Sequence, residues 1–269
     1  MITNVNGINL YYEDKGEGPA IVFIHGLGEN ADSWKYQMDY FQKSFRVINV
    51  DLRGHHRSED GDKFITMELF AEDVIELLNK LEIEKAHFVG LSMGGLICQE
   101  LTKKYSDRML TMTLCDAAGF YPEEMATTGL QQRLERIEKM PMEELGALIG
   151  KAASKPDLDE KELNWVISLF QLNRPKPYAQ ATESTLKADY REIHANINVP
   201  TFILVGALDP VTPISFAQYL NEHIKNSKMQ IIPEASHMSK IDNYQGFNKA
   251  LLEFLAAYEI DSYKNMLTH

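Results

Sequence analysis

The stretch Ala86-His87-Phe88-Val89-Gly90-Leu91-Ser92-Met93-Gly94-Gly95-Leu96-Ile97 decides the fold of this chain. Its first four residues are mostly apolar, as in a buried strand, and the residues after Gly95 repeat apolar positions at helical spacing. The G-x-S-x-G pattern between them predicts a sharp turn that exposes the Ser92 hydroxyl at the start of a helix, where flanking glycines relieve crowding. Ser92 is therefore a candidate nucleophile.

Strand-like runs alternate with helical patterns along much of the chain, which predicts an α/β fold with a mostly parallel central sheet flanked by helices. Several runs are apolar throughout, as expected of strands that helices cover on both faces. The predicted strands are Asn9 to Glu13, Ala20 to Ile24, Arg46 to Val50, Ala86 to Val89, Met109 to Cys115, Thr201 to Val205 and Met229 to Ile232.

Helix signals lie between and after these strands. Thr66 can cap a helix whose apolar residues recur at helical spacing. Thr212 followed by Pro213 predicts another helix start, with the proline in the first turn. An apolar stripe from Phe247 to Tyr258 predicts a helix that faces the core near the end of the chain.

Residues 120–187 interrupt the alternation of strands and helices. This segment contains no strand-like run, is rich in Glu, Lys, Met and Leu, and has breaks at Pro141, Pro156, Pro175 and Pro177. We expect it to form a helical lid inserted before the strand Thr201 to Val205. The α/β core would then consist of residues 1–119 and 188–269.

Composition excludes several classes of protein. The chain has 269 residues and a formal net charge of −12, which argues against a nucleic-acid surface. No apolar run approaches the roughly 18 residues that span a bilayer, and the N-terminus lacks the features of a secretory signal, so we expect a cytoplasmic protein. Cys98 and Cys115 lie among apolar neighbours and are expected to be buried, which leaves no disulfide framework or cysteine-based zinc site.

Four motifs in order resemble those of the α/β-hydrolase family, and the resemblance runs from about Gly7 to Tyr258. They are His25-Gly26-Leu27-Gly28, Asp51-Leu52-Arg53-Gly54-His55-His56-Arg57-Ser58, the turn at Ser92, and Gly206 to Pro213 together with Ser236-His237-Met238. The chain is most similar to small carboxylesterases and to lactonases related to 3-oxoadipate enol-lactonase. The resemblance implies the α/β-hydrolase fold and a catalytic triad of Ser92, Asp209 and His237.

Bond chemistry explains why these residue types occur together. A serine hydroxyl is a weak nucleophile at neutral pH and needs a base, and a histidine base needs a carboxylate to fix its tautomer. Backbone N–H groups of Leu27 and Met93 are the expected oxyanion hole. Water completes the reaction, so we expect no metal and no organic cofactor.

Two carboxylates could orient His237, because each follows a strand-like run. Asp116 comes after Leu114-Cys115, and Asp209 comes after Val205-Gly206. The glycine before Asp209 and the helix start after it match the family's acid from the later strand, so we favour Asp209. Among the histidines, His25 and His55 are expected to make structural hydrogen bonds. His56 stands where the family pattern has glycine.

The substrate is the least determined feature. Phe120, Met125, Trp165 and Phe170 are candidates for an apolar acyl pocket, although such residues also pack between helices. Arg133, Arg136 and Arg174 could instead pair with a carboxylate-bearing substrate such as an acidic lactone, or could simply lie on the surface.

The sequence thus predicts a serine carboxylesterase that acts on small to medium, mostly uncharged esters. The same triad could serve a lactonase, a carbon–carbon bond hydrolase or a perhydrolase. A ligand receptor or signalling protein of this fold, with slow turnover, is the alternative from another class. The expected partner is a small-molecule ester, with no nucleic acid and no membrane, and the sequence leaves the oligomeric state open.

Overall fold

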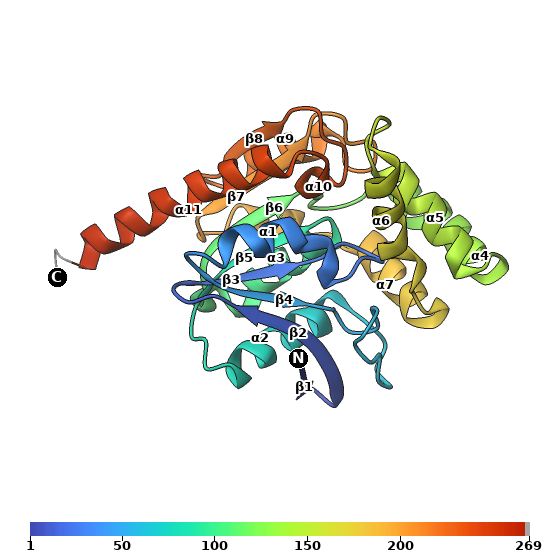
Figure 1. The fold of residues 1–269 in the computed structure, drawn as a ribbon, viewed down its shortest axis with the longest axis horizontal. Coiled ribbons are helices and arrows are strands. Elements are labelled where there is room, and N and C mark those ends of the chain that lie inside the picture. Colours follow the sequence, from blue (N-terminus) through green and yellow to red (C-terminus); the bar gives the residue numbers. More distant parts are fainter. Residues whose placement is uncertain (267–269) are drawn as a thin grey trace.

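The computed structural model describes residues 1–266, with side chains described as far as Tyr258. A twisted eight-stranded sheet lies at its centre in the order β1-β2-β4-β3-β5-β6-β7-β8 (Figure 1). The strands are β1 (Ile2–Val5), β2 (Ile8–Lys15), β3 (Ala20–Ile24), β4 (Arg46–Val50), β5 (Ala86–Leu91), β6 (Met109–Cys115), β7 (Thr201–Gly206) and β8 (Lys228–Ile232).

The sheet is mostly parallel, as the sequence predicted. The strands β3 to β8 pair in parallel, and only β1 with β2 and β2 with β4 pair antiparallel. The predicted strands at β3, β4 and β6 agree with the observed bounds residue for residue. The prediction missed β1, a short edge strand whose exposed face gives only a weak alternating pattern.

Helices cover both faces of the sheet. One apolar cluster joins the sheet to α2, α3 and α9, through residues such as Phe70, Leu96 and Leu220. A second joins the other face to α1 and α11, through residues such as Met38 and Leu251. The bounds of these helices are α1 (Lys35–Phe41), α2 (Met67–Lys80), α3 (Met93–Lys104), α9 (Ile214–His223), α10 (Ser239–Asp242) and α11 (Tyr244–Met266), with short 3₁₀ turns at η1 (Ala31–Trp34) and η2 (Ser106–Arg108).

Of the two predicted helix starts, one is confirmed and one is wrong. Thr66 caps α2 as expected, because its hydroxyl accepts a hydrogen bond of 3.1 Å from the N–H of Leu69. The helix α9 begins at Ile214 with Pro213 at its N-cap, so the prediction of Thr212 as the cap was wrong. The Thr212 hydroxyl is used elsewhere, at the candidate active site. The predicted C-terminal stripe lies within α11.

Between β6 and β7 the chain forms helices, which gather at one side of the sheet (Figure 1). We call α4 to α7 with the preceding π-helical turn the helical insertion. The segments that flank it lie side by side, since Phe120 and Asp189 form an isolated β-bridge. Its elements are η3 (Met125–Gly129), α4 (Leu130–Lys139), α5 (Met142–Ala153), α6 (Glu160–Gln171) and α7 (Pro175–Lys187), and α8 (Arg191–His194) follows.

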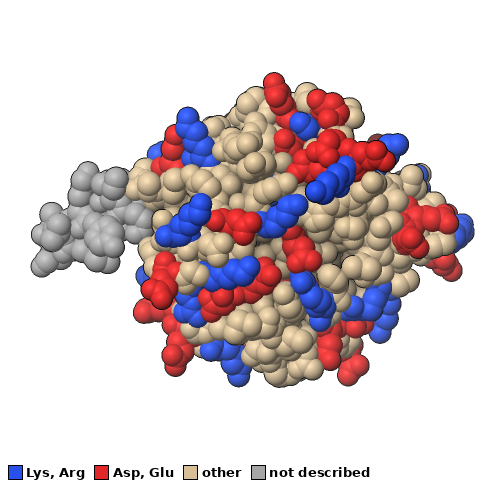
Figure 2. Space-filling model, viewed as in Figure 1, with Lys and Arg blue, Asp and Glu red and all other residues tan. Residues whose placement is uncertain are grey.

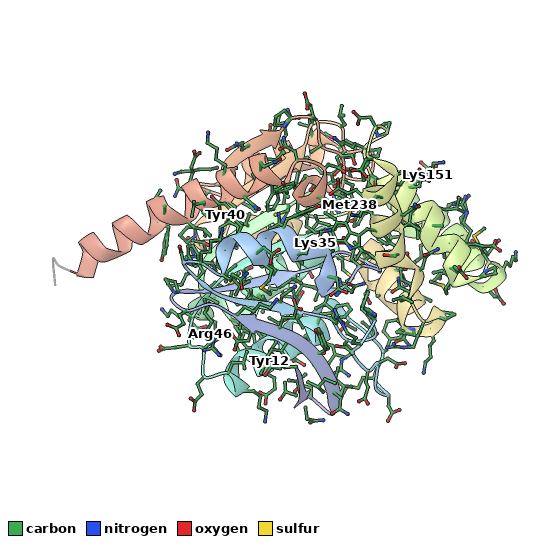
Figure 3. All side chains as sticks on the ribbon, in the orientation of Figure 1. Tyr12, Lys35, Tyr40, Arg46, Lys151 and Met238 are labelled. Atoms are coloured by element: carbon green, nitrogen blue, oxygen red, sulfur yellow. The ribbon has the colours of Figure 1, made fainter. Side chains whose placement is uncertain are left out.

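The insertion packs against the loop that follows β8. Met238 lies where α10 meets the insertion (Figure 3), in an apolar cluster with Ala153, Val166 and Phe170. The N–H of Met238 also donates to the Ala153 carbonyl at 3.3 Å. The insertion therefore contacts the segment that contains His237.

On the face drawn in Figure 2, basic and acidic side chains are intermixed, with no continuous basic stripe. Both cysteines are buried, as predicted, and burial raises the pKa of each thiol. Within the described part of the chain, no helix is long and apolar enough to cross a membrane.

Candidate active site

Ser92 occupies the turn between β5 and α3. Its φ of 52° is in the left-handed region, and its N–H donates to the Cys115 carbonyl at 2.9 Å, which fixes the turn against β6. A β-carbon on Gly90 would lie 2.2 Å from the Gly94 carbonyl oxygen, and one on Gly94 would lie 2.2 Å from the Ile24 carbonyl oxygen. The tight turn therefore needs glycine at both positions of the motif.

Asp209 and His237 come together from the loops after β7 and β8. The Nδ1 atom of His237 lies 2.9 Å from Oδ2 of Asp209. The other carboxylate oxygen of Asp209 accepts hydrogen bonds from the N–H groups of Val211 at 2.7 Å and Thr212 at 3.0 Å. The Thr212 hydroxyl donates to Oδ2 at 2.8 Å, so the carboxylate is held at both oxygens.

This arrangement favours ionised Asp209 and a basic His237. Burial alone would lower the pKa of His237, but the hydrogen bond and charge of Asp209, with the charges of Asp116 and Glu29, raise it above its ordinary value. Burial alone would raise the pKa of Asp209, yet the hydrogen bond and charge of His237 and the bonds from Thr212 hold it below its ordinary value.

Asp116, the alternative acid, faces other partners. Its Oδ1 accepts from the Gly206 N–H at 2.7 Å, and its Oδ2 accepts from the Ser239 hydroxyl. Burial, followed by the charge of Asp209, raises the pKa of Asp116 to about 8. Both carboxylate oxygens of Asp116 thus bond groups other than His237, whereas Asp209 bonds His237 directly, so the geometry favours Asp209 as the orienting acid.

The loop after β3 lies beside Ser92. His25 is buried and makes structural hydrogen bonds: its Nδ1–H donates to the Gly26 carbonyl at 2.8 Å, and its Nε2 accepts from the Leu52 N–H at 3.0 Å. Gly28 has a φ of 80°, and its carbonyl accepts from the Asn173 side chain of the insertion at 2.7 Å. The insertion is thus bonded directly to this loop.

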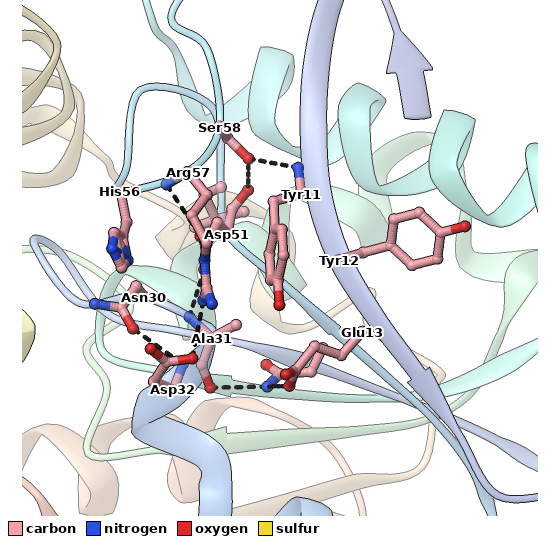
Figure 4. Close-up of polar contacts among 12 residues, drawn as sticks. Tyr11, Tyr12, Glu13, Asn30, Ala31, Asp32, Asp51, His56, Arg57 and Ser58 are labelled. Atoms are coloured by element: carbon pink, nitrogen blue, oxygen red, sulfur yellow. Dashed lines mark hydrogen bonds and ion pairs between the residues drawn. The ribbon is translucent and has the colours of Figure 1, made fainter. Parts of the chain in front are cut away.

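A buried carboxylate, Asp51, bonds the segment that follows this loop (Figure 4). Asp51 accepts from the Ala31 N–H at 2.7 Å and from the Arg57 guanidinium at 2.6 and 3.0 Å. Arg57 also bonds Asp32 at 2.9 Å and lies 3.7 Å from the centre of the Tyr11 ring. Asp51 and Arg57 therefore support the segment after the loop, and neither residue lines the cavity described below.

His56, which replaces the family's glycine, adopts a φ of 40°. Histidine therefore accommodates the left-handed turn that the pattern assigns to glycine.

Ser92 and His237 line one cavity of about 240 Å³ between the sheet and the insertion. Tyr121 lines the same cavity, and burial raises the pKa of its phenol to about 12. The lining residues are Leu27, Glu29, Ser92, Tyr121, Met125, Arg133, Arg136, Ile137, Leu145, Ile149, Ala152, Ala153, Phe170, Tyr178, Thr182, Thr185, Val211 and His237.

The predicted pocket residues separate into two pairs. Met125 and Phe170 line the cavity. Trp165 lies between α6 and α1, where the Lys35 ammonium is 3.2 Å from its ring centre and the Tyr36 ring is 5.9 Å away. Phe120 packs against Tyr219, with ring centres 5.1 Å apart. The structure therefore does not bring Trp165 and Phe120 into the cavity.

The three candidate arginines lie in two different places. Arg133 and Arg136 line the cavity, and neither forms an ion pair with a carboxylate in the described part of the chain. Arg174 instead donates to the backbone carbonyls of His56 at 3.0 Å and Ser58 at 2.7 Å. Arg174 is thus a contact between the insertion and the core.

Sequence reasoning missed Glu29 as a cavity residue. Glu29 lies next to the His25–Gly28 motif, and its carboxylate pairs with Lys240, far away in the chain. An acidic residue directly after a candidate oxyanion loop was the available signal, but its partner could be identified only from the fold.

The fold and this geometry define an α/β hydrolase. The family model described as alpha/beta hydrolase fold matches residues 19–244, and the chain belongs to that family. The curated 3-oxoadipate enol-lactonase 1 of Acinetobacter baylyi is 33% identical over 265 residues, which cover 96% of this chain and 97% of the relative. These matches confirm the predicted family and fold.

Solved structures agree with this assignment. The enol-lactonase from Burkholderia xenovorans superposes with a TM-score of 0.89 at 29% identity, covering 95% of this chain and all of the other (100%). A thermophilic esterase from Thermogutta terrifontis, in a malate-bound structure, has a TM-score of 0.88 at 25% identity, covering 96% and 97% of the two chains. The family and its relatives support a hydrolase.

Proposed function

We propose that this protein is a serine carboxylesterase that hydrolyses small to medium carboxylic esters through an acyl-enzyme. The observation that carries the proposal is the 2.9 Å contact between His237 and Asp209 in the wall of the cavity that also contains Ser92. A base with its tautomer fixed, next to a serine on a strained turn, is the arrangement that activates a hydroxyl.

The reaction follows from these positions. Since Asp209 holds the Nδ1–H, Nε2 of His237 is left to accept the Ser92 proton. The serine oxygen attacks the ester carbon, and the N–H groups of Leu27 and Met93 stabilise the oxyanion. Met93 is the first residue of α3, where N–H groups lack partners within the helix.

Collapse of the tetrahedral intermediate breaks the bond to the alkoxy oxygen, which takes the proton from His237 and leaves as the alcohol. Water then gives a proton to His237 and attacks the acyl carbon, and the same steps in reverse order release the acid and restore Ser92. The helical insertion acts as a lid that shields the acyl-enzyme.

The cavity size favours a small acyl group. Its volume of about 240 Å³ lies below the roughly 300–1,000 Å³ typical of sites for drug-sized ligands. Met125 and Phe170 supply apolar surface on its wall.

A second candidate is a lactone or ester that carries a carboxylate. Arg133 and Arg136 line the cavity without a carboxylate partner in the described residues, and a guanidinium is suited to bind a substrate carboxylate. The 33% identical relative is named an enol-lactonase, which supports this candidate.

The test compares kcat/KM for p-nitrophenyl esters from acetate to palmitate with a panel of lactones with and without a carboxylate. Fast multiple turnover of neutral short esters supports the esterase. If only carboxylate-bearing lactones are turned over, and Arg133→Gln removes that preference, the second candidate is correct. A single slow turnover with the acyl group retained would point to a receptor instead.

A further inference from the structure

A buried ion pair lies in the wall of the active-site cavity. The Nζ atom of Lys240 is 2.5 Å from Oε2 of Glu29, and the two side chains are 0% and 2% exposed. The same Nζ lies 4.7 Å from the centre of the Trp34 ring. Glu29 lines the cavity with Ser92 and His237, whereas Lys240 is not among the lining residues. The carboxylate is therefore the member of the pair that faces the reaction.

The pair connects two loops of the candidate machinery. Glu29 directly follows the loop that carries Leu27, and its N–H donates to the Gly26 carbonyl at 3.2 Å. A β-carbon on Gly26 would lie 2.4 Å from Oε1 of Glu29, so the carboxylate rests on that loop. Lys240 belongs to α10, shortly after His237, and its backbone carbonyl accepts from Gln37 at 2.9 Å.

The charge of Glu29 also affects the pKa of His237. Burial would raise the pKa of Glu29, but the charge and hydrogen bond of Lys240 outweigh this and hold the pKa below its ordinary value, so Glu29 is ionised. Three carboxyl groups act on His237 from different elements: Asp209 after β7, Asp116 after β6, and Glu29 after β3. Glu29 is the one on the side of the oxyanion loop.

We propose that Glu29 and Lys240 form a positioning pair for the proposed reaction. Their ion pair fixes the loop of Leu27 relative to the segment of His237, and the Glu29 carboxylate supports the imidazolium that His237 forms. The inference rests on the proposed function, since it assigns a role within that same site.

Stability alone does not explain such a pair. Apolar residues of similar volume often replace a buried ion pair without loss of stability, whereas removing one partner leaves an unpaired buried charge and is strongly destabilising. A variant that replaces both partners can therefore separate positioning from folding.

The test uses the double variant Glu29→Gln/Lys240→Met in the full-length protein. A matched control is Arg53→Met/Asp73→Asn, because Arg53 and Asp73 form another buried ion pair, 1% and 0% exposed, outside the cavity lining. Thermal unfolding shows whether each variant folds. The single variant Glu29→Gln keeps the size of the side chain and an oxygen that can accept from Lys240, and it gives the same readout if the double variant fails to fold.

The measurements are kcat, KM and the pH dependence of kcat/KM on a p-nitrophenyl ester. We expect the double variant to lose roughly tenfold to a hundredfold in kcat with little change in KM, as for a small misplacement of catalytic groups. In the Glu29→Gln variant, the rise of kcat/KM that follows deprotonation of His237 should move to lower pH, since a negative charge beside the imidazolium is gone. The shift should have the same direction but be smaller in the double variant, which also loses the opposing charge of Lys240. The control variant should keep the wild-type pH dependence of kcat/KM.

Two results would count against the proposal, and a third counts against the function itself. The positioning role would be overturned if a folded double variant, or a folded Glu29→Gln variant, had wild-type kcat and the wild-type pH dependence of kcat/KM. The role would also be overturned if the control variant shifted the pH dependence of kcat/KM by the same amount. If the wild-type protein neither hydrolyses esters nor reacts with a fluorophosphonate at Ser92, the proposed function has failed, independently of the pair.

Discussion

The substitution Asp209→Asn should trap His237 in the unproductive tautomer. Oδ1 of Asp209 accepts from the N–H groups of Val211 at 2.7 Å and Thr212 at 3.0 Å. In the variant, the amide oxygen must stay at this position, because an NH₂ group there would face two donors. The NH₂ group then occupies the Oδ2 position, 2.9 Å from Nδ1 of His237. Nδ1 must accept from it, so the imidazole proton moves to Nε2, where the Ser92 proton should go.

The size of the effect follows from this forced tautomer. In the serine-protease case, the corresponding replacement of the orienting aspartate lowers kcat on the order of 10⁴-fold, about 5.4 kcal/mol in activation free energy. Asp209→Asn keeps the hydrogen bonds from the backbone N–H groups of Val211 and Thr212, so the fold should be retained and the loss should appear in kcat.

Asp116→Asn is the matched control. An asparagine there can accept from the Gly206 N–H through its oxygen and donate to the Ser239 hydroxyl through its NH₂ group, which replaces both bonds of Asp116. It should retain most activity. The assay is steady-state hydrolysis of a p-nitrophenyl ester by both variants, with circular dichroism to confirm folding. Full activity in Asp209→Asn together with loss in Asp116→Asn would refute the reasoning and move the acid to Asp116.

Three further predictions concern the base, the cavity and the lid. Burial lowers the pKa of His237, but the hydrogen bond and charge of Asp209 outweigh this and raise it. As the His237 imidazolium loses its proton, kcat/KM should therefore rise with pH through a single ionisation above about 6.5. A flat profile from about pH 5 to 9 in a stable protein would exclude His237 as the base. Lengthening the acyl chain should raise kcat/KM only until the cavity of about 240 Å³ is full, whereas a steady rise to palmitate would indicate an open groove. Asn173→Leu removes the 2.7 Å bond to the Gly28 carbonyl, so kcat should fall roughly threefold to tenfold at similar KM. A raised KM with unchanged kcat would instead mean that the helical insertion only binds substrate.

Much of the fold follows from local sequence. The apolar runs of β3, β4 and β6 are buried on both faces, so composition alone sets their limits. The turn at Ser92 follows from close backbone approach, which glycine alone permits at Gly90 and Gly94. The edge strand β1 could not be found this way, because its residues are mostly exposed and its strand character depends on pairing with β2.

The lining of the cavity depends on tertiary packing. Trp165 and Phe170 lie on the same helix, α6, and only Phe170 faces the cavity, because the other side of α6 packs against α1 through Tyr36. Glu29 and Lys240 are 211 residues apart, and no local pattern connects them. Likewise, Thr212 carries a helix-capping signal but bonds Asp209 instead, since the acid needs its hydroxyl.

The most direct test of the central claim is intact-protein mass spectrometry after brief reaction with a p-nitrophenyl ester or a fluorophosphonate, followed by peptide mapping. The account predicts a single covalent adduct on Ser92 in the wild-type protein, no adduct in Ser92→Ala, and a loss of kcat in that variant on the order of 10³- to 10⁶-fold while the fold is kept. An adduct on another residue, or a folded Ser92→Ala variant whose kcat is within about tenfold of wild type, would contradict it.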